Sequence, residues 1–187
     1  MIEWYLFSVI AFVLLFIFQL NAVKKNIIRR LDLIACIIFD FYIAFLIKFV
    51  FFPIPFQDIS IQSIREINGN FSFNLIPFKS LVLAFKIGDI SNLIYQFGGN
   101  LILLLPMGIY ISIIFSKFNI KKNLIIIAIS SLSIEIIQFI IGLIINCQYR
   151  VVDIDDVIFN IVGGLIGLLI GLLLQPLYNK LCDIILS

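Results

Sequence analysis

The chain has 187 residues, of which 63% are hydrophobic and 13% charged, with a net charge of +2 and a mean hydropathy of +1.20. An average soluble domain is about 45–50% apolar and about 25% charged, and a chain of this length cannot bury two thirds of its side chains. The composition therefore excludes a soluble globular domain, a disordered chain and a coiled-coil rod. Histidine is absent, which excludes Ser-His triads and His proton relays, and the three cysteines lack zinc-ligand spacing. We expect no metal site and no cofactor.

A helix that crosses a bilayer needs about 20 mostly apolar residues. Five segments meet this requirement, at residues 4–21, 31–52, 93–115, 123–145 and 157–174. Pro53 ends the second segment, Pro106 lies inside the third, and Pro176 follows the fifth. The expected fold is therefore all-α, a polytopic membrane protein with five transmembrane helices. No internal repeat divides the chain, so we expect one domain over residues 1–187.

The connection between the second and third spans, residues 53–92, is too polar to cross a membrane. Its segment 71–85 is nevertheless apolar enough to lie in the plane of the membrane interface. We therefore expect an outer loop with an interfacial segment.

Charged residues divide the connections into two kinds. The first and third connections contain bases and no acids: Lys24, Lys25, Arg29, Arg30, Lys117, Lys121 and Lys122. The other two connections contain six acids: Asp58, Glu66, Asp89, Asp153, Asp155 and Asp156. Because basic loops stay on the cytoplasmic side, this distribution predicts an N-out, C-in orientation with both acidic loops facing outward.

Polar residues inside a span are costly in hydrocarbon and need a partner or a purpose. In the fourth span, Ser131, Glu135, Gln138 and Gly142 follow one another at intervals of four, three and four residues, which places them on one helical stripe. A second stripe runs through Asp153, Asp156, Asn160, Gly163, Gly167 and Gly171. Its glycines allow the backbone of a neighbouring helix to approach closely, so this stripe faces protein.

The polar positions on three spans share a depth. Asn100, Glu135, Gln138 and Asn160 lie roughly 10–15 Å below the outer ends of their helices, at 1.5 Å per residue. We expect Asp153 to cap the last helix. Pro106 leaves the carbonyl of Ile102 without its usual donor.

Two interpretations of this polar set are open. In the first, it is an outward-facing pocket in which Arg150 anchors an anion and Glu135 acts as a hydrogen-bond donor or general acid/base. In the second, it is an interhelical network in which Glu135 bonds to Asn160 and Gln138, while Arg150 pairs with Asp153 or Asp156. We favour a site for the set as a whole.

Two further acidic features are interpreted separately. The acidic trio at 153, 155 and 156 has oxygen ligands for a divalent cation, but a solvated acidic loop is the favoured interpretation. Asp40, inside the second span, either joins the polar set or bonds to a neighbouring helix. Lys48 snorkels to the outer interface, and Cys36 and Cys182 are expected to serve packing.

The sequence resembles the VanZ-like family of small bacterial membrane proteins. The motifs that carry the resemblance are Asn74-Leu-Ile-Pro77-Phe78, Gly99-Asn100 followed by Pro106-Met107-Gly108, Glu135-Ile-Ile-Gln138, and the spaced series Arg150, Asp153, Asp156, Asn160 and Gly163-Gly164. They cover about half the chain in the family's order. Met107 stands where a larger aromatic residue is expected.

The resemblance implies an accessory factor in glycopeptide (teicoplanin) resistance or cell-envelope maintenance, located in the bacterial cell membrane. Three hypotheses follow: a non-enzymatic protein that binds an antibiotic or a lipid-linked cell-wall precursor, an intramembrane enzyme acting on a lipid-linked phosphate or ester, and a transporter or channel. We favour binding, through Asn100, Glu135, Gln138, Arg150, Asp153, Asp156 and Asn160. Glu135 is the candidate catalytic residue of the enzyme hypothesis, which lacks an evident nucleophile. We expect membrane lipids and a lipid-linked precursor or lipoglycopeptide as partners, and no nucleic acid.

Overall fold

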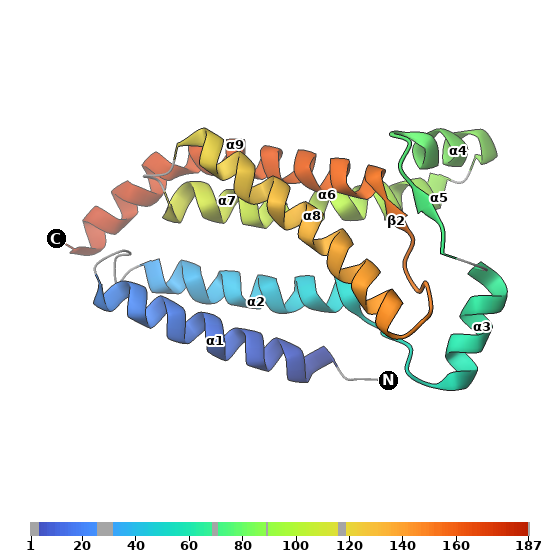
Figure 1. Ribbon diagram of the computed structural model, residues 1–187. Helices are drawn as coiled ribbons and strands as arrows, with labels where there is room; N and C mark the ends of the chain where they lie inside the picture. Colours follow the sequence, from blue (N-terminus) through green and yellow to red (C-terminus); the bar gives the residue numbers. More distant parts are fainter. Residues whose placement is uncertain (1–3, 26–31, 69–70, 89, 116–118, 187) are drawn as a thin grey trace.

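The computed structural model describes residues 4–25, 32–68, 71–88, 90–115 and 119–186. Long helices run lengthwise beside one another, while the short elements gather at one end of the molecule, on the right in Figure 1. The elements are α1 (Trp4–Lys24), α2 (Asp32–Phe51), α3 (Asp58–Asn68), β1 (Phe73–Asn74), α4 (Lys79–Ile87), α5 (Ile90–Leu93), the π-helix η1 (Ile94–Gly98), α6 (Gly99–Leu103), α7 (Leu105–Ile114), α8 (Ile120–Ile144), β2 (Val152–Asp153) and α9 (Ile154–Leu186).

Apolar helices dominate the fold. Among the described residues, four helical segments are long and apolar enough to cross a membrane: Asp32–Phe51, Ile94–Ile114, Ile120–Ile144 and Ile154–Ile184. In the first predicted span, the apolar part of α1 is the shorter Val9–Lys24. An all-α membrane protein is thus confirmed, whereas the fifth span and the N-out orientation stay predictions. Arg29, Arg30, Lys117 and Asp89, which entered the orientation argument, lie outside the described residues.

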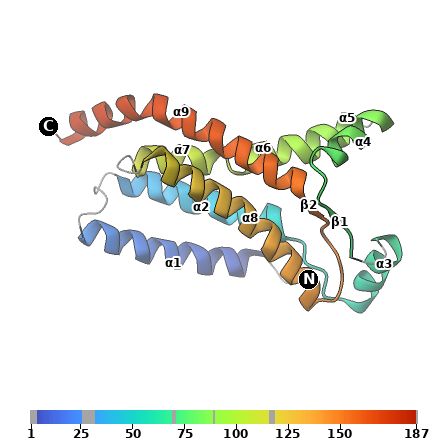
Figure 2. The same cartoon turned by 45° about the horizontal axis from the view of Figure 1, so that its top comes forward.

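The glycines of α9 bring its backbone against the third span. A Cβ added at Gly163 would meet the carbonyl oxygen of Leu101 in α6, and one at Gly167 would meet that of Leu105 at the start of α7. A Cβ at Gly171 would meet the Ser112 hydroxyl in α7. The predicted close approach along this stripe is therefore confirmed, and α9 lies along α6 and α7 in both views (Figures 1 and 2).

The third span is broken into several pieces. A π-helical turn, η1, precedes α6, and Leu104 leaves helical geometry with φ −98° and ψ 1° before α7 begins at Leu105, with Pro106 in its first turn. The hydroxyl of Tyr42 in α2 donates a 2.8 Å hydrogen bond to the carbonyl of Leu103. Pro106 predicted that the Ile102 carbonyl lacks its usual donor. The acceptor that the side chain of α2 reaches is the next carbonyl, that of Leu103.

The last helix is longer than predicted. Instead of ending near Leu174, α9 continues through Pro176 to Leu186. Proline inside a membrane helix is tolerated where neighbouring groups re-satisfy the backbone. Beyond the proline, the Tyr178 hydroxyl donates a 2.8 Å hydrogen bond to Asp32 at the start of α2, which holds the extension against the bundle.

The outer loop folds into α3, β1 and α4. The predicted interfacial segment 71–85 is divided between the two-residue strand β1 and the helix α4, which ends at Gly88 with a left-handed φ of 74°. Val82, Leu83 and Phe85 are exposed on α4. Their exposure agrees with a helix that lies on the membrane interface.

Candidate functional site

The outer end of α9 is built around Asp153. This residue pairs with Asn74 in the parallel register of β1 and β2, and its carboxylate accepts a 2.8 Å hydrogen bond from the backbone N–H of Asp155. A side-chain acceptor for the second amide of a helix is an N-cap. The predicted helix start at Asp153 is therefore confirmed.

The loop between β1 and α4 is tied to the acids of α9. Asp155 accepts backbone N–H groups from Phe78 at 2.5 Å and Ser80 at 3.2 Å. Asp153 accepts from the Asn74 amide at 2.8 Å and from the Ser80 hydroxyl at 2.6 Å. Asp153 is only 4% exposed and Asp155 is fully buried. The favoured interpretation of a solvated acidic loop is therefore wrong for these two residues, because side-chain and backbone donors from a distant loop replace water.

Phe78 holds an unusual backbone conformation in this loop. Its φ is 63°, at the third position of a turn in which Lys79 N–H donates to the Ile76 carbonyl at 3.2 Å. Pro77 favours the second position of such a turn, but the third position normally needs glycine. A bulky residue there is strained. The hydrogen bond from Phe78 to Asp155 stabilises the conformation from the other side.

Deeper in the bundle, Asp156 joins the third span to α9. The Asn100 amide in α6 donates to the Asp156 carboxylate at 2.5 Å, and the side chain of Gln96 in η1 also hydrogen-bonds to it. The predicted convergence of Asn100 with the polar stripe of α9 is confirmed by this contact. The π-helical turn aims Gln96 at the same carboxylate, and such turns are frequent at functional sites.

Two buried oxygens next to this group have no partner. Glu135 in α8 is 4% exposed and Asn160 in α9 is 1% exposed. Among the described residues, no hydrogen-bond partner reaches Oε2 of Glu135 or Oδ1 of Asn160. Buried polar atoms are normally hydrogen-bonded, so each exception needs an explanation.

The charges around Glu135 are mostly negative. Asp156, Asp153 and Arg150 are the charged groups that act on it electrostatically. One turn away, the Ser131 hydroxyl donates to the Val157 carbonyl at 3.0 Å, which joins α8 to the first turn of α9. The expected bonds from Glu135 to Asn160 and Gln138 are not seen among the described contacts.

Gln138 and Arg150 instead reach the end of α2. Gln138 donates to the Val50 carbonyl at 2.8 Å, and Arg150 donates to the Phe49 carbonyl at 3.4 Å. These carbonyls lie in the last turn of a helix, where Pro53 cannot supply the usual donor to Phe49. Arg150 is exposed and bonds to a carbonyl rather than to the Asp153 or Asp156 that the network interpretation assigned to it.

Tyr149 lies beside Arg150 in the turn between α8 and β2. Its hydroxyl is buried and has no partner among the described residues. Burial raises the pKa of this phenol to about 12, and the nearby Arg150 guanidinium opposes the shift only in part. The Tyr149 hydroxyl is therefore shielded from water, although Arg150 beside it is exposed.

Sequence reasoning missed several residues of this end. Gln148 accepts the Ser72 N–H at 2.6 Å and donates to the Ser72 carbonyl at 2.5 Å, so its side chain extends the pairing of β1. Ser80 and Gln96 were missed as well, because their partners are about 60 to 75 residues distant. The sequence signal that could have pointed to this end was the position of Asp155, two residues after the capping residue Asp153. Among the described residues, no group of three or more acidic or sulfur side chains is arranged to hold a metal ion.

A second polar cluster lies toward the opposite end. Gln19 in α1 donates to Asp40 in α2 at 2.6 Å, and Cys36 contacts the Tyr110 hydroxyl of α7 at 3.3 Å. Of the two expectations for Asp40, bonding to a neighbouring helix is therefore the one observed. Cys36 and Cys182 are buried, in agreement with packing.

Comparison with known proteins agrees with the resemblance seen in the motifs. The family model described as VanZ/LLP1 matches residues 39–175. This range includes the polar end from Asn74 to Asn160, and it excludes α1 and the first residues of α2. No curated protein and no solved structure gives a match.

Proposed function

Because the chain belongs to the VanZ/LLP1 family, we propose that it is an accessory factor in glycopeptide (teicoplanin) resistance or cell-envelope maintenance. It resides in a bacterial cell membrane, with α1 as a fifth span. The basic end, which carries Lys24, Lys25, Lys121 and Lys122, faces the cytoplasm. The acidic end then faces outward.

The outer polar end binds the head group of a membrane-inserted molecule. The observation that carries this proposal is the pair of buried oxygens on Glu135 and Asn160 that find no partner in the described part of the chain. A buried acceptor without a donor costs about 1–3 kcal/mol, and a ligand that brings donors removes this cost. Asn74 Oδ1 is a third such acceptor in the same end of the molecule.

The chemistry of these atoms favours a head group rich in hydroxyl, amide or ammonium donors. Asp153 and Asp155 are already occupied by the 74–80 loop, so they position the site rather than contact the ligand. Arg150 is exposed at the rim and accommodates an anionic group of the same molecule. A lipid-linked cell-wall precursor or a lipoglycopeptide offers both kinds of group.

Teicoplanin susceptibility of a Gram-positive host tests this proposal. The wild-type chain should protect the host, and Glu135→Leu and Asn160→Leu, which remove the acceptors without adding bulk, should abolish most of the protection. Glu66→Leu, at an exposed position of α3, is the matched control and should protect fully. Membrane abundance is measured for each variant, and equal protection by all of them would contradict a site at Glu135.

Glu135→Gln separates binding from chemistry. A glutamine keeps a hydrogen-bonding oxygen but does not titrate, so binding should survive in large part. An intramembrane enzyme that uses Glu135 as acid or base would lose its activity in this variant. Loss of protection in Glu135→Gln at normal abundance would therefore favour the enzyme.

A further inference from the structure

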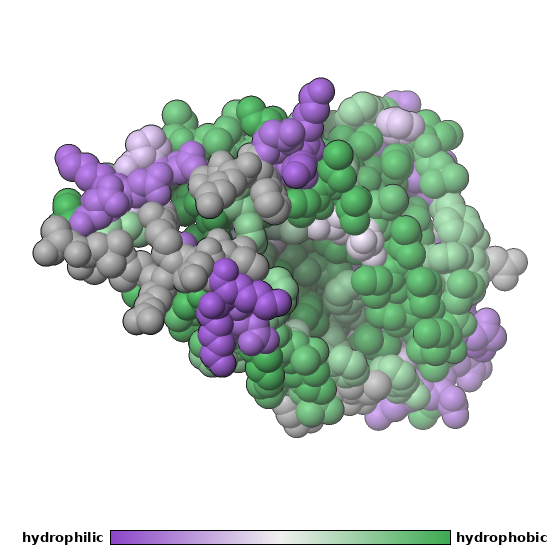
Figure 3. Space-filling model, turned by 60° about the vertical axis from the view of Figure 1, so that its left-hand side comes forward, coloured by the Kyte–Doolittle hydropathy of each residue, from purple (hydrophilic) through white to green (hydrophobic). Residues whose placement is uncertain are grey.

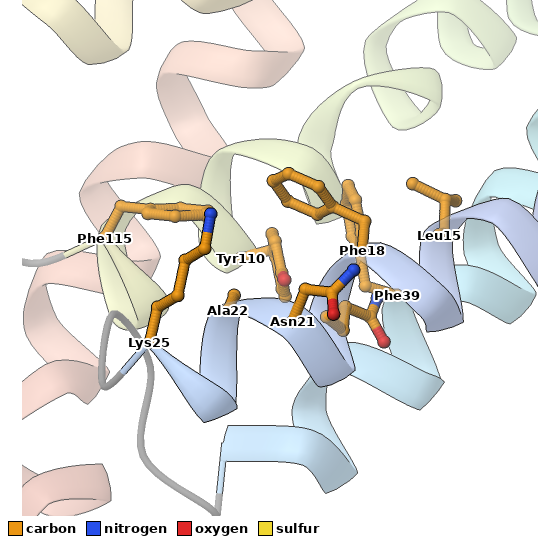
Figure 4. Close-up of a pocket in the computed structure, with 9 residues that line it drawn as sticks. Leu15, Phe18, Asn21, Ala22, Lys25, Phe39, Tyr110 and Phe115 are labelled. Atoms are coloured by element: carbon orange, nitrogen blue, oxygen red, sulfur yellow. The ribbon is translucent and has the colours of Figure 1, made fainter.

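A cavity of about 350 Å³ lies among α1, α2 and α7, toward the end of the bundle opposite the outer polar cluster. Figure 4 shows its lining, and Figure 3 shows a hollow in the apolar surface at this end of the molecule. Phe18 and Ala22 of α1, Phe39 of α2 and Tyr110 of α7 form much of the wall. Its volume falls at the lower end of the range for small-molecule sites.

The wall of this cavity is preformed. The rings of Phe39 and Tyr110 stack with their centroids 3.8 Å apart, and the Tyr110 hydroxyl is held by Cys36. Gln19, which also lines the cavity, is fixed by its bond to Asp40. These contacts hold the Phe39, Tyr110 and Gln19 part of the wall in place.

The polarity of the cavity changes along its length. Lys25, just after α1, lies at one end and is exposed. Gln19 lies about 9 Å deeper along the helix, at 1.5 Å per residue, and is 5% exposed. Among the described residues, no partner reaches its Oε1 atom. The cavity thus combines a cationic mouth with an aromatic interior.

The surroundings of the mouth are basic. Lys24, Lys121 and Lys122 lie at the same end of the bundle as Lys25, since α1 ends there and α8 begins there (Figure 1). Two acids act on Tyr110 of the wall, Asp40 and Asp32. Both are buried, and they are hydrogen-bonded by Gln19 and Tyr178, respectively. An anion at the mouth is therefore attracted by lysines and is not opposed by an exposed carboxylate of the lining.

We propose that this cavity binds an anionic phospholipid, with its phosphate at Lys25 and one acyl chain along Phe18, Phe39 and Tyr110. The cavity lies among membrane helices, so an amphiphile from the bilayer reaches it without crossing water. The lysine ammonium is a strong point charge that recognises phosphate. A zwitterionic lipid fits the apolar wall equally well but offers the mouth no net charge.

Native mass spectrometry of the full chain, with phosphatidylglycerol and phosphatidylcholine of identical acyl chains, tests the charge requirement. The wild-type protein should retain phosphatidylglycerol in preference to phosphatidylcholine. Lys25→Gln should lower the retention of phosphatidylglycerol about fivefold, the effect of one base near an anionic lipid. Lys24→Gln, one residue away but not in the lining, should lower it clearly less than Lys25→Gln does.

Ala22→Leu tests the apolar part by filling the cavity, and it should reduce the retention of both lipids together. Thermal unfolding in detergent without added lipid shows that each variant is folded. Equal retention of the two lipids by the wild type would overturn the proposal. Equal losses in Lys24→Gln and Lys25→Gln would overturn it in favour of a diffuse surface attraction.

Discussion

The seam between α9 and the third span differs sharply from the contact of α1 with α2 and α7. Along the seam, glycines at 163 and 167 place backbone against backbone and leave no room for a Cβ. Around α1, the corresponding contacts are made by phenylalanine and tyrosine rings, and a cavity of about 350 Å³ remains. Small residues let helices meet without gaps, whereas rigid rings meet only where their shapes match.

The polar groups of the two regions differ in how many segments bind them. Asp153, Asp155 and Asp156 are bonded by donors from β1, from the turn at Phe78, from α4 and from α6. Asp40 is bonded by Gln19 of one neighbouring helix. Both regions keep buried oxygens without a partner among the described residues, and the region around α1 has a cavity in addition.

The largest effect is expected where the seam is tightest. Gly163→Leu places a side chain on the Leu101 carbonyl, a backbone atom that no rotamer change moves away. We expect destabilisation of about 3 kcal/mol or more, measured by unfolding in mixed detergent. In the control Gly99→Ala, the new Cβ meets nothing within 4 Å, so stability should stay the same or rise by less than about 1 kcal/mol. Equal losses of stability in the two variants would contradict the close backbone approach at Gly163.

A smaller effect is expected where Asp155 holds the loop between β1 and α4. Asp155→Ala removes the acceptor of the Phe78 and Ser80 amides, and leaving buried donors unpaired costs about 1–3 kcal/mol. Hydrogen exchange at these two amides should accelerate by about 30-fold for a loss of about 2 kcal/mol. The exposed Asp58, changed to alanine, should leave them protected. Unchanged exchange in Asp155→Ala would show that the loop is held by other contacts.

The smallest effect is expected at Tyr149. Burial raises its pKa to about 12, so it stays neutral at pH 10, where an ordinary tyrosine is about half ionised. Tyr149→Phe should therefore leave the tyrosinate absorbance of the folded protein at pH 10 unchanged, while it removes one ionising group from the unfolded protein. Because the pKa of Tyr149 is higher in the folded than in the unfolded protein, its contribution to the free energy of unfolding is complete below about pH 10 and is lost as the pH rises towards 12. A lower tyrosinate signal in the folded variant at pH 10 would contradict the burial of Tyr149.

Much of the site followed from helical spacing. Asn100 meets Asp156, Asp153 caps α9, and the glycine stripe faces a neighbouring helix, because a fixed rise and turn decide which residues share a face. Asp155, in contrast, was predicted to be solvated, and it is buried. Its burial depends on the loop around Phe78, which is 77 positions away in the chain.

Gln138 and Arg150 illustrate the same limit. The network interpretation bonded Gln138 to Glu135 and paired Arg150 with an acid of α9, but both side chains reach carbonyls in the last turn of α2. The sequence shows that Pro53 cannot donate a hydrogen bond to the Phe49 carbonyl. Which side chain donates to this end of α2 instead depends on how α8 packs against α2.

Composition and spacing by themselves determined that this chain is an all-α membrane protein with polar residues gathered toward one end, because a helix in hydrocarbon must be long and apolar and its polar residues need a partner or a function. Only the tertiary structure decided which polar atoms are satisfied. Among the described residues it leaves one buried oxygen each on Glu135 and Asn160 without a partner, and it leaves a cavity beside Lys25. These features depend on contacts between segments distant in the chain. Such contacts are set by the packing of whole helices and leave no periodic signal in the sequence.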